Sequence, residues 1–144
     1  MYKRILVPID DSDTVDSILR EVSRMCAEHR DRTIILLHVL RPVHGLSVGA
    51  GYVVDTGDVQ TRMEQDGHQI LERASERLSH VGVASKLVLE WGEPAHEISR
   101  YAEREDVDLI VVGNKDKSLL DKLLSGSVSQ RVVEKAPADV LVVK

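Results

Sequence analysis

Short aliphatic runs that alternate with helical patterns are the feature that most limits how this chain can fold. Five runs rich in Val, Ile and Leu are typical of strands buried on both faces, namely residues 4–9, 33–40, 85–91, 108–113 and 139–144. Helices are predicted between them at 15–26, 59–80, 94–104 and 127–135, the first two from apolar residues spaced three or four apart. This alternation predicts an α/β fold, with one open, twisted parallel sheet and helices on both of its faces.

Two connections in this pattern are longer than a compact domain needs. Residues 41–58 and 114–125 follow the second and fourth strands, and we expect both to be loops. Loops of this length are usually functional. Both leave the carboxyl ends of strands, which is where an open parallel sheet forms its ligand crevice. Ser12 or Asp13 is expected to cap the first helix near the same edge.

The charge balance and the missing residue patterns exclude several classes of function. Lys and Arg number 19 against 24 Asp and Glu, for a net charge of -5, and no basic block marks a nucleic-acid partner. No apolar run approaches the roughly 18 residues of a membrane span, so we expect a cytoplasmic protein without a membrane partner. The single cysteine, Cys26, falls on the apolar stripe of the first helix and is expected to pack in the core. The histidines include no pair with the spacing of a helical metal site, and neither a metal nor a redox cofactor is predicted.

Three features fall at the predicted carboxyl edge of the sheet. Asp10 and Asp11 directly follow the first strand, Gly113 ends the fourth, and Gly126-Ser127 opens the last helix. The free N–H groups and positive dipole of a helix start suit a phosphate, and a carboxylate at Asp10 suits the hydroxyl pair of a ribose. Each feature also has a plainer interpretation, in which the aspartates begin a turn and Gly126-Ser127 caps a helix. A phospho-receiver domain is excluded, because the third strand does not end in an acceptor aspartate.

Six segments spaced along the chain carry a resemblance to a known family. They are VPIDDSD at 7–13, LHVL at 37–40, GEP at 92–94, DLIVVG at 108–113, SGSVSQRVV at 125–133 and DVLVV at 139–143. In this order they resemble the universal stress protein family, and the resemblance covers essentially all of residues 1–144 as one domain. It implies a Rossmann-like sheet with strand order 3-2-1-4-5. It also implies a homodimer paired through the fifth strand, which would hide an apolar edge formed by Val140, Leu141, Val142 and Val143.

The family's nucleotide contacts carry over to this sequence position by position. In its ATP-binding branch they imply ATP or AMP as the ligand, with or without Mg²⁺. Asp10 would hold the ribose, while Ile9, with Pro8 before it, and Val39 would border the adenine. The phosphates would be held by Val112, Gly113, Asn114, Gly126, Ser127, Val128 and Ser129.

One residue departs from the family's phosphate loop, which reads Gly, two residues, Gly, nine residues, then Gly-Ser or Gly-Thr. The spacing is kept here, but Asp116 stands in place of the second glycine. Asp adds a side chain and a charge that repels a triphosphate, although Lys115 and Lys117 flank it. The resemblance implies a stress-response protein that binds adenine nucleotide and acts on a protein partner that the sequence does not identify.

Two other functions stay open. In one, Asp116 closes the site, and the chain is a dimeric interaction module that binds no nucleotide. In the other, the chain is a weak ATPase. No Gly-x-Ser-x-Gly, Walker or His-x-Gly-His motif occurs, so we assign no catalytic residue and expect a protein that is not an enzyme.

Overall fold

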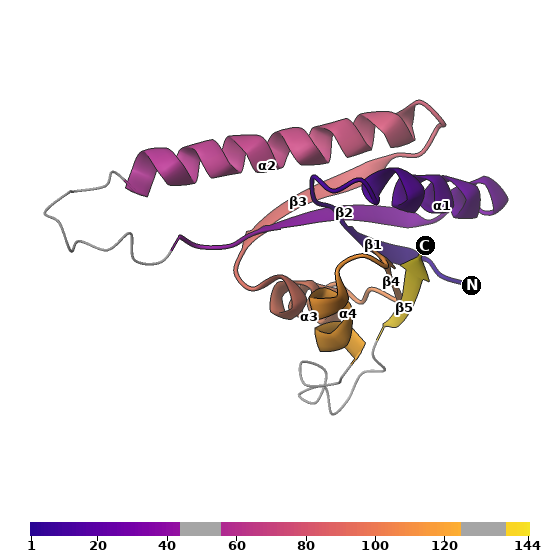
Figure 1. The fold of residues 1–144 in the computed structure, drawn as a ribbon. Coiled ribbons are helices and arrows are strands. Elements are labelled where there is room, and N and C mark those ends of the chain that lie inside the picture. The colour runs from indigo at the N-terminus through magenta and orange to yellow at the C-terminus, as the bar shows by residue number, and fades with distance from the viewer. Residues whose placement is uncertain (44–55, 125–137) are drawn as a thin grey trace, which may run out of the picture.

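The protein folds into a parallel sheet flanked by helices (Figure 1), and the computed structural model describes residues 1–43, 56–124 and 138–144. The strands are β1 (Arg4–Pro8), β2 (Thr33–Leu40), β3 (Ser85–Trp91), β4 (Leu109–Gly113) and β5 (Asp139–Val143). The helices are α1 (Val15–Glu28), α2 (Thr56–Ser79), α3 (Pro94–Arg104) and α4 (Lys117–Leu124). The strands pair in parallel in the order β3-β2-β1-β4-β5, which confirms the predicted fold class and strand order.

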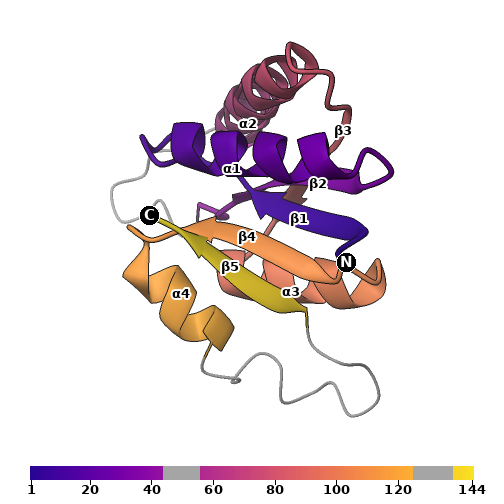
Figure 2. The ribbon, with the colours of Figure 1, turned by 90° about the vertical axis from the view of Figure 1, so that its right-hand side faces the viewer.

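Helices cover both faces of the sheet in pairs. α1 and α2 lie on one face, and α3 and α4 lie on the other (Figures 1 and 2). Successive strand side chains point to opposite faces, so each face has its own apolar cluster. Ile5 and Val7 of β1 pack with α1 and α2, whereas Leu6 between them packs with α3. The central strands are therefore buried on both sides, as their continuous aliphatic sequence predicts.

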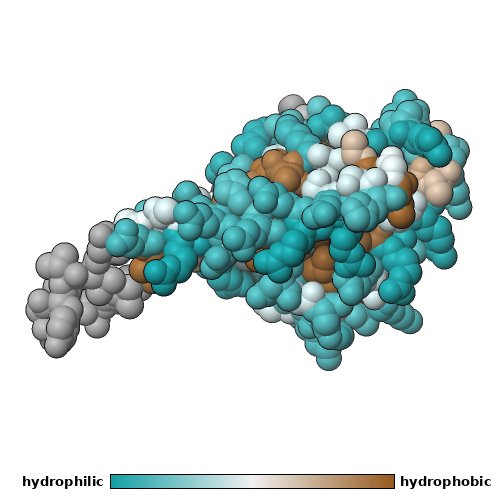
Figure 3. All heavy atoms as spheres, turned by 90° about the horizontal axis from the view of Figure 1, so that it is seen from above, coloured by the Kyte–Doolittle hydropathy of each residue, from teal (hydrophilic) through white to brown (hydrophobic). Residues whose placement is uncertain are grey.

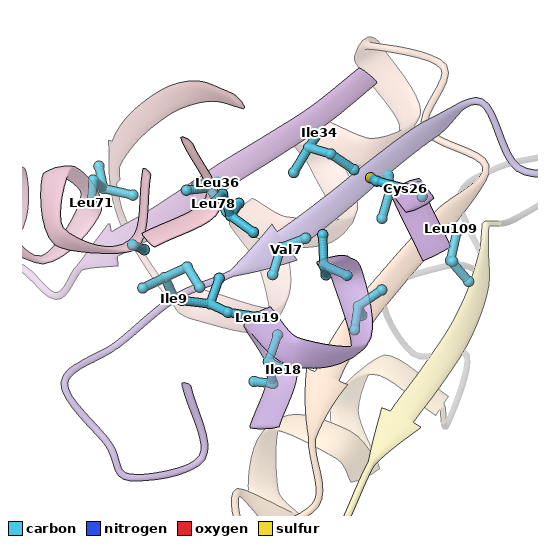
Figure 4. Close-up of a cluster of buried hydrophobic side chains, with 14 residues drawn as sticks. Val7, Ile9, Ile18, Leu19, Cys26, Ile34, Leu36, Leu71, Leu78 and Leu109 are labelled. Carbon is cyan, nitrogen blue, oxygen red and sulfur yellow. The ribbon is translucent and has the colours of Figure 1, made fainter. Parts of the chain in front are cut away.

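The cluster beneath α1 and α2 also holds the single cysteine (Figure 4). Cys26 is buried there among aliphatic side chains, which confirms its predicted place in the core. Burial raises the pKa of the Cys26 thiol above its ordinary value, because a thiolate is poorly solvated in such surroundings. Packing is therefore the role that the structure gives this residue.

α2 approaches β2 and β3 closely at a glycine. A Cβ atom at Gly67 would lie 2.8 Å from Leu89 Cδ1, so a larger residue there would require the Leu89 side chain or the helix to shift. The outward face of the layer formed by α1 and α2 is mostly hydrophilic (Figure 3), as expected for helices with one side in water. No helix in the described part of the chain is long and apolar enough to cross a membrane.

Three local expectations are wrong. Residues 114–125 do not form one loop, because α4 occupies Lys117–Leu124. α2 begins at Thr56, so the end of the other predicted loop, 41–58, belongs to a helix. α1 is not capped by Ser12 or Asp13: Thr14 is its N-cap residue, and no side chain makes a capping hydrogen bond there. The predicted helix 127–135 lies outside the described residues.

Candidate functional site

A pocket of about 450 Å³ opens at the carboxyl ends of β2, β1 and β4, the three central strands of the sheet. Its volume falls within the roughly 300–1,000 Å³ of small-molecule sites. Its lining joins apolar strand ends to polar side chains from the loops that follow them. The apolar part includes Pro8, Ile9, Leu37, Val39, Ile98 and Val112, and the polar part includes Asp10, Ser12, Thr14, His38, Arg41, Lys115 and Asp116. Such a lining suits a ligand with a flat apolar portion and polar substituents.

The turn after β1 is held by its own polar side chains. Asp10 Oδ1 accepts a hydrogen bond from the Ser12 N–H at 2.8 Å, and Ser12 Oγ lies 2.7 Å from Thr14 Oγ1. An aspartate that bonds the N–H two residues later is a common turn device. This contact uses only one carboxylate oxygen, so Asp10 Oδ2 has no hydrogen-bond partner among the described residues. Asp10 is exposed and lines the pocket, where that oxygen can accept hydrogen bonds from a ligand.

Gly113 lets the end of β4 approach the start of α1. A Cβ atom at this position would lie 3.0 Å from both Cβ and Oγ1 of Thr14 and 3.4 Å from Ile18 Cδ1. Those distances are tighter than ordinary Cβ contacts, so a larger residue would require Thr14 to shift, and glycine suits the close packing at the back of the pocket. The need for glycine here comes from space and not from a left-handed backbone.

His38 joins the ends of β1 and β2. Its Nδ1 lies 2.6 Å from the carbonyl oxygen of Ile9, and the Ile9 N–H donates to the Leu37 carbonyl at 2.8 Å. A carbonyl can only accept, so Nδ1 carries the proton and Nε2 is the acceptor in the neutral ring. The side chain is half-buried and lines the pocket. Its contact fixes the position of Ile9, directly before Asp10.

An ion pair connects the two loops on either side of the pocket. Lys115 Nζ, after β4, donates to Asp13 Oδ2, before α1, at 2.8 Å. This hydrogen bond and the ammonium charge lower the pKa of Asp13 below its ordinary value. Both side chains are exposed, at 63% for Lys115 and 77% for Asp13, so the pair is open to competition from another ion.

Asp116 has a structural role at the start of α4. Its Oδ1 accepts a hydrogen bond from the Leu119 N–H at 3.0 Å, and its carbonyl accepts from the Leu120 N–H at 3.1 Å. These are the contacts of a helix N-cap, at which aspartate is one of the preferred residues. The side chain that stands in place of a family glycine therefore stabilises a helix that the sequence reasoning missed.

A second polar contact holds α4 against α3. Lys122 Nζ donates to Glu93 Oε1 at 3.1 Å, and Glu93 Oε2 also accepts from the His96 N–H at 2.9 Å as the N-cap of α3. Partial burial raises the pKa of Glu93, but the hydrogen bonds from the His96 N–H, Lys122 and the Ala95 N–H, together with the Lys122 charge, lower it by more, so the pKa lies below its ordinary value. One carboxylate thus both caps α3 and ties α4 beside the pocket.

The structure brings together the predicted site residues that it describes, with one exception. Pro8, Ile9, Asp10, Val39, Val112 and Gly113 all line the pocket. Asn114 is exposed and outside the lining, and its N–H donates to the Val143 carbonyl at 3.0 Å. Gly126, Ser127, Val128 and Ser129 lie outside the described residues.

Several pocket residues were not assigned from the sequence. Ser12, Thr14 and Ile18 come from the turn and first helix after β1, while His38 and Arg41 come from the end of β2. Pro94 and Ile98 come from α3, and Leu119 comes from α4. Extending the strand-end argument to the first turn of each following helix would have found most of them, because these turns lie over the same edge.

Two further expectations, that the protein has no metal site and that β5 pairs with a second copy, are only partly tested by the described residues outside the pocket. No group of three or more His, Cys, Asp or Glu in the described ranges is placed to hold a metal ion. β5 lies at one edge of the sheet, where Val142 is 37% exposed. Pairing of that edge with a second copy stays a prediction.

Comparison with known proteins connects this fold and pocket to one family. The model of the Universal stress protein family matches residues 1–144. Universal stress protein YxiE of Bacillus subtilis is 32% identical, over 100% of both chains. Universal stress protein MJ0577 of Methanocaldococcus jannaschii is 31% identical over 100% of this chain and 96% of its own. The solved structure of MJ0577, which covers 100% of this chain and 96% of that one, gives a TM-score of 0.72.

A third similar protein was solved with a ligand. The universal stress protein of Archaeoglobus fulgidus in complex with dAMP has a TM-score of 0.67 at 22% identity, with 99% and 98% of the two chains covered, and it shares the fold. The family model covers the whole chain, and two full-length relatives are more than 30% identical to it. This chain belongs to the universal stress protein family.

Proposed function

We propose that this chain binds an adenine nucleotide in the pocket at the carboxyl edge of the sheet and acts as a regulatory binding protein. The observation that carries the proposal is the Asp10 carboxylate, which lies in the turn after the central strand β1, lines the pocket and uses only Oδ1 in that turn. A carboxylate oxygen has two lone pairs, so Asp10 can accept hydrogen bonds from both hydroxyls of a ribose.

The surroundings of Asp10 fit the rest of such a ligand. Ile9 and Val39 offer an apolar surface for the base on the β2 side, and Gly113 and Lys115 line the pocket on the β4 side, where the phosphates would lie. The dAMP complex of the Archaeoglobus fulgidus protein supports an adenine nucleotide as the ligand class, since that protein shares this fold.

A regulatory role follows from what the ligand would contact. The Asp13–Lys115 pair joins the two loops that border the pocket, and an anionic ligand competes for the Lys115 ammonium. Binding would therefore weaken the contact between these loops and change their conformation, and a protein partner that binds the loops would respond to the nucleotide. A ligand shifts such an equilibrium only by its difference in affinity for the two loop states.

The test is calorimetric titration of AMP and ATP into the nucleotide-free protein, with Asp10→Asn and Asp11→Asn as a matched pair. Asparagine keeps the bond to the Ser12 N–H but loses the charged acceptor, and hydrogen bonds to charged groups contribute about 1.5–3 kcal/mol. We expect Asp10→Asn to weaken AMP binding roughly ten-fold or more. Asp11, which is exposed and outside the pocket lining, should tolerate the same change. Absence of heat with the unaltered chain, or equal loss in both variants, would overturn the proposal.

We also propose that β5 pairs with β5 of a second copy. The strand is the edge of the sheet, and its Val142 is as exposed as Leu87 on β3 at the opposite edge, at 37% each. An exposed apolar edge strand favours pairing with another chain. Val142→Lys should dissociate a dimer in sedimentation velocity, while Leu87→Lys, at the other edge, should not. A monomeric unaltered chain would contradict this arrangement.

A further inference from the structure

We infer that Arg41 contacts the base of the ligand and widens the base specificity of the pocket, so that 6-oxopurine nucleotides bind there as well as adenine nucleotides. The inference rests on the proposed nucleotide site, in which the base lies on the β2 side of the pocket. It gives a role to a charged side chain of the lining that the fold itself does not use.

The first observation is the position of Arg41. It lines the pocket directly after β2, two positions beyond Val39. The backbone before it is held in place, because the Gly92 N–H donates to the Leu40 carbonyl at 2.9 Å. Val39 packs with the apolar cluster on the α3 side of the sheet. The long side chain of Arg41 can therefore reach the edge of a base that lies on Val39.

The second observation is that the Arg41 guanidinium has no partner among the described residues. The side chain is exposed, and it makes no hydrogen bond or ion pair within the ranges that the structure describes. Lys115, which also lines the pocket, is instead paired with Asp13 at 2.8 Å. A guanidinium presents five N–H donors and accepts nothing. A ligand that offers acceptors to Arg41 therefore gains hydrogen bonds without displacing a described side chain.

The third observation is that the polar side chains of β2 in the lining lie on different faces of the sheet. A Cβ atom at Gly67 of α2 would lie 3.1 Å from His38 Cδ2, so His38 lies against α2. α2 and α3 cover opposite faces (Figures 1 and 2), and Val39 packs on the α3 side. The Nδ1 atom of His38 is also used by the Ile9 carbonyl. A base on Val39 thus meets a donor in Arg41 and no acceptor side chain from the described part of β2.

The donors of Arg41 match the edge of a 6-oxopurine better than that of adenine. Guanine and hypoxanthine present two neighbouring acceptors, O6 and N7, and an arginine can donate to both at once. Adenine keeps N7 but carries an amino group at position 6, so it offers one acceptor and one opposing donor. Hydrogen bonds from a charged donor are roughly twice as strong as those between neutral groups. Arg41 therefore favours the 6-oxopurine between two bases of nearly the same size.

The experiment compares the dissociation constants of AMP and of inosine monophosphate (IMP) for the unaltered full chain, Arg41→Met and Arg62→Met. The two ligands share their ribose and phosphate, so the ratio of their constants isolates the contact with the base. Methionine keeps an apolar stem at position 41 and removes the donors. Arg62 is exposed on α2 outside the pocket lining, and its variant controls for the loss of one positive charge. Thermal unfolding of each variant verifies that the fold is kept.

The unaltered chain should bind IMP at least as tightly as AMP. Arg41→Met should weaken IMP binding at least about five-fold more than AMP binding, because only the 6-oxopurine loses a second charge-assisted hydrogen bond. Arg62→Met should leave the ratio of the two constants unchanged. Weaker binding of IMP than of AMP by the unaltered chain, or an equal effect of Arg41→Met on both ligands, overturns this inference alone. No binding of either nucleotide by the unaltered chain overturns the proposed function and this inference together.

Discussion

The two walls of the pocket are held in different ways. α1 packs into the core on one side through four buried side chains, Ile18, Leu19, Val22 and Cys26. On the other side α4 has no buried residue, and partly buried leucines, the Asp116 cap and the Lys122–Glu93 pair attach it. A fully buried aliphatic side chain contributes about 1.5–3 kcal/mol, whereas an exposed ion pair contributes about 0–1 kcal/mol. The α1 wall is therefore a fixed scaffold, and the α4 wall is the one that a ligand can move at small cost.

The largest expected effect compares one leucine from each wall. Leu19→Ala, at a position 3% exposed, removes buried methyl groups and leaves a cavity, so we expect a loss of about 2–5 kcal/mol in the free energy of unfolding. Leu120→Ala, on α4, should cost less than half as much, because this side chain is only partly buried. Urea denaturation of both variants measures the difference. Equal losses would show that α4 is as firmly built into the fold as α1.

The contact between the two walls gives a second prediction. Gly113→Ala places a Cβ atom 3.0 Å from Thr14, so the Thr14 side chain at the start of α1 must shift. Overpacking of this kind costs about 1–3 kcal/mol, and it should also weaken nucleotide binding, because the displaced atoms line the pocket. Asn114→Ala is the matched control, since its side chain is exposed and only its backbone N–H is hydrogen-bonded to the part of the chain that the structure describes. A melting temperature for Gly113→Ala equal to that of the control would refute the need for close approach.

The cap of α4 gives a third, smaller effect. Asp116→Ala leaves the Leu119 N–H without its acceptor and should cost about 1 kcal/mol of stability, whereas Asp116→Asn should cost little. Chemical denaturation at neutral pH separates the two variants. If alanine and asparagine behave alike, the hydrogen bond does not stabilise the helix, and the α4 wall is held by its leucines and the Lys122–Glu93 pair.

The smallest effect is the pH dependence of the exposed ion pairs. Asp13 and Glu93 have pKa values below their ordinary 3.8 and 4.5, so their contacts stabilise the fold above those values. That stability is lost as the pH falls through the lower folded-state pKa of each group. The urea midpoint should therefore decline below about pH 4.5 in the unaltered chain, and Lys115→Met with Lys122→Met should decline less. Parallel pH curves would show that neither pair contributes to stability.

The same contrast explains what the sequence could predict. The strands and α1 were predictable because their buried residues form recognisable aliphatic patterns in the sequence. The pattern is continuous in a strand such as Arg4–Pro8 and recurs at helical spacing in Val15–Glu28. α4 was missed although its leucines recur at helical spacing after a good N-cap residue, because its segment was interpreted through the spacing of a phosphate loop. A single hydrogen bond, from the Leu119 N–H to Asp116, marks where that helix begins.

For the site, the residues at the strand ends were predictable from the sequence, but the contacts between distant residues were not. Asp10 and Gly113 follow from the rule that ligands bind at the carboxyl ends of parallel strands. The contacts of His38 with Ile9 and of Lys115 with Asp13 join residues far apart in the chain, and only the fold brings them together. No local pattern in the sequence encodes such a pairing.

The most direct test of nucleotide binding at this edge is a titration of the isotope-labelled chain with AMP, followed by amide chemical shifts. We expect the largest changes on the pocket segments 8–14, 37–41 and 112–119, with α2 and the start of β3 little affected. Larger changes are expected after β4 than within α1, because the α4 wall is the more weakly held. If saturating AMP leaves the amides of Ile9, Val39 and Gly113 unshifted, the nucleotide does not bind at this edge.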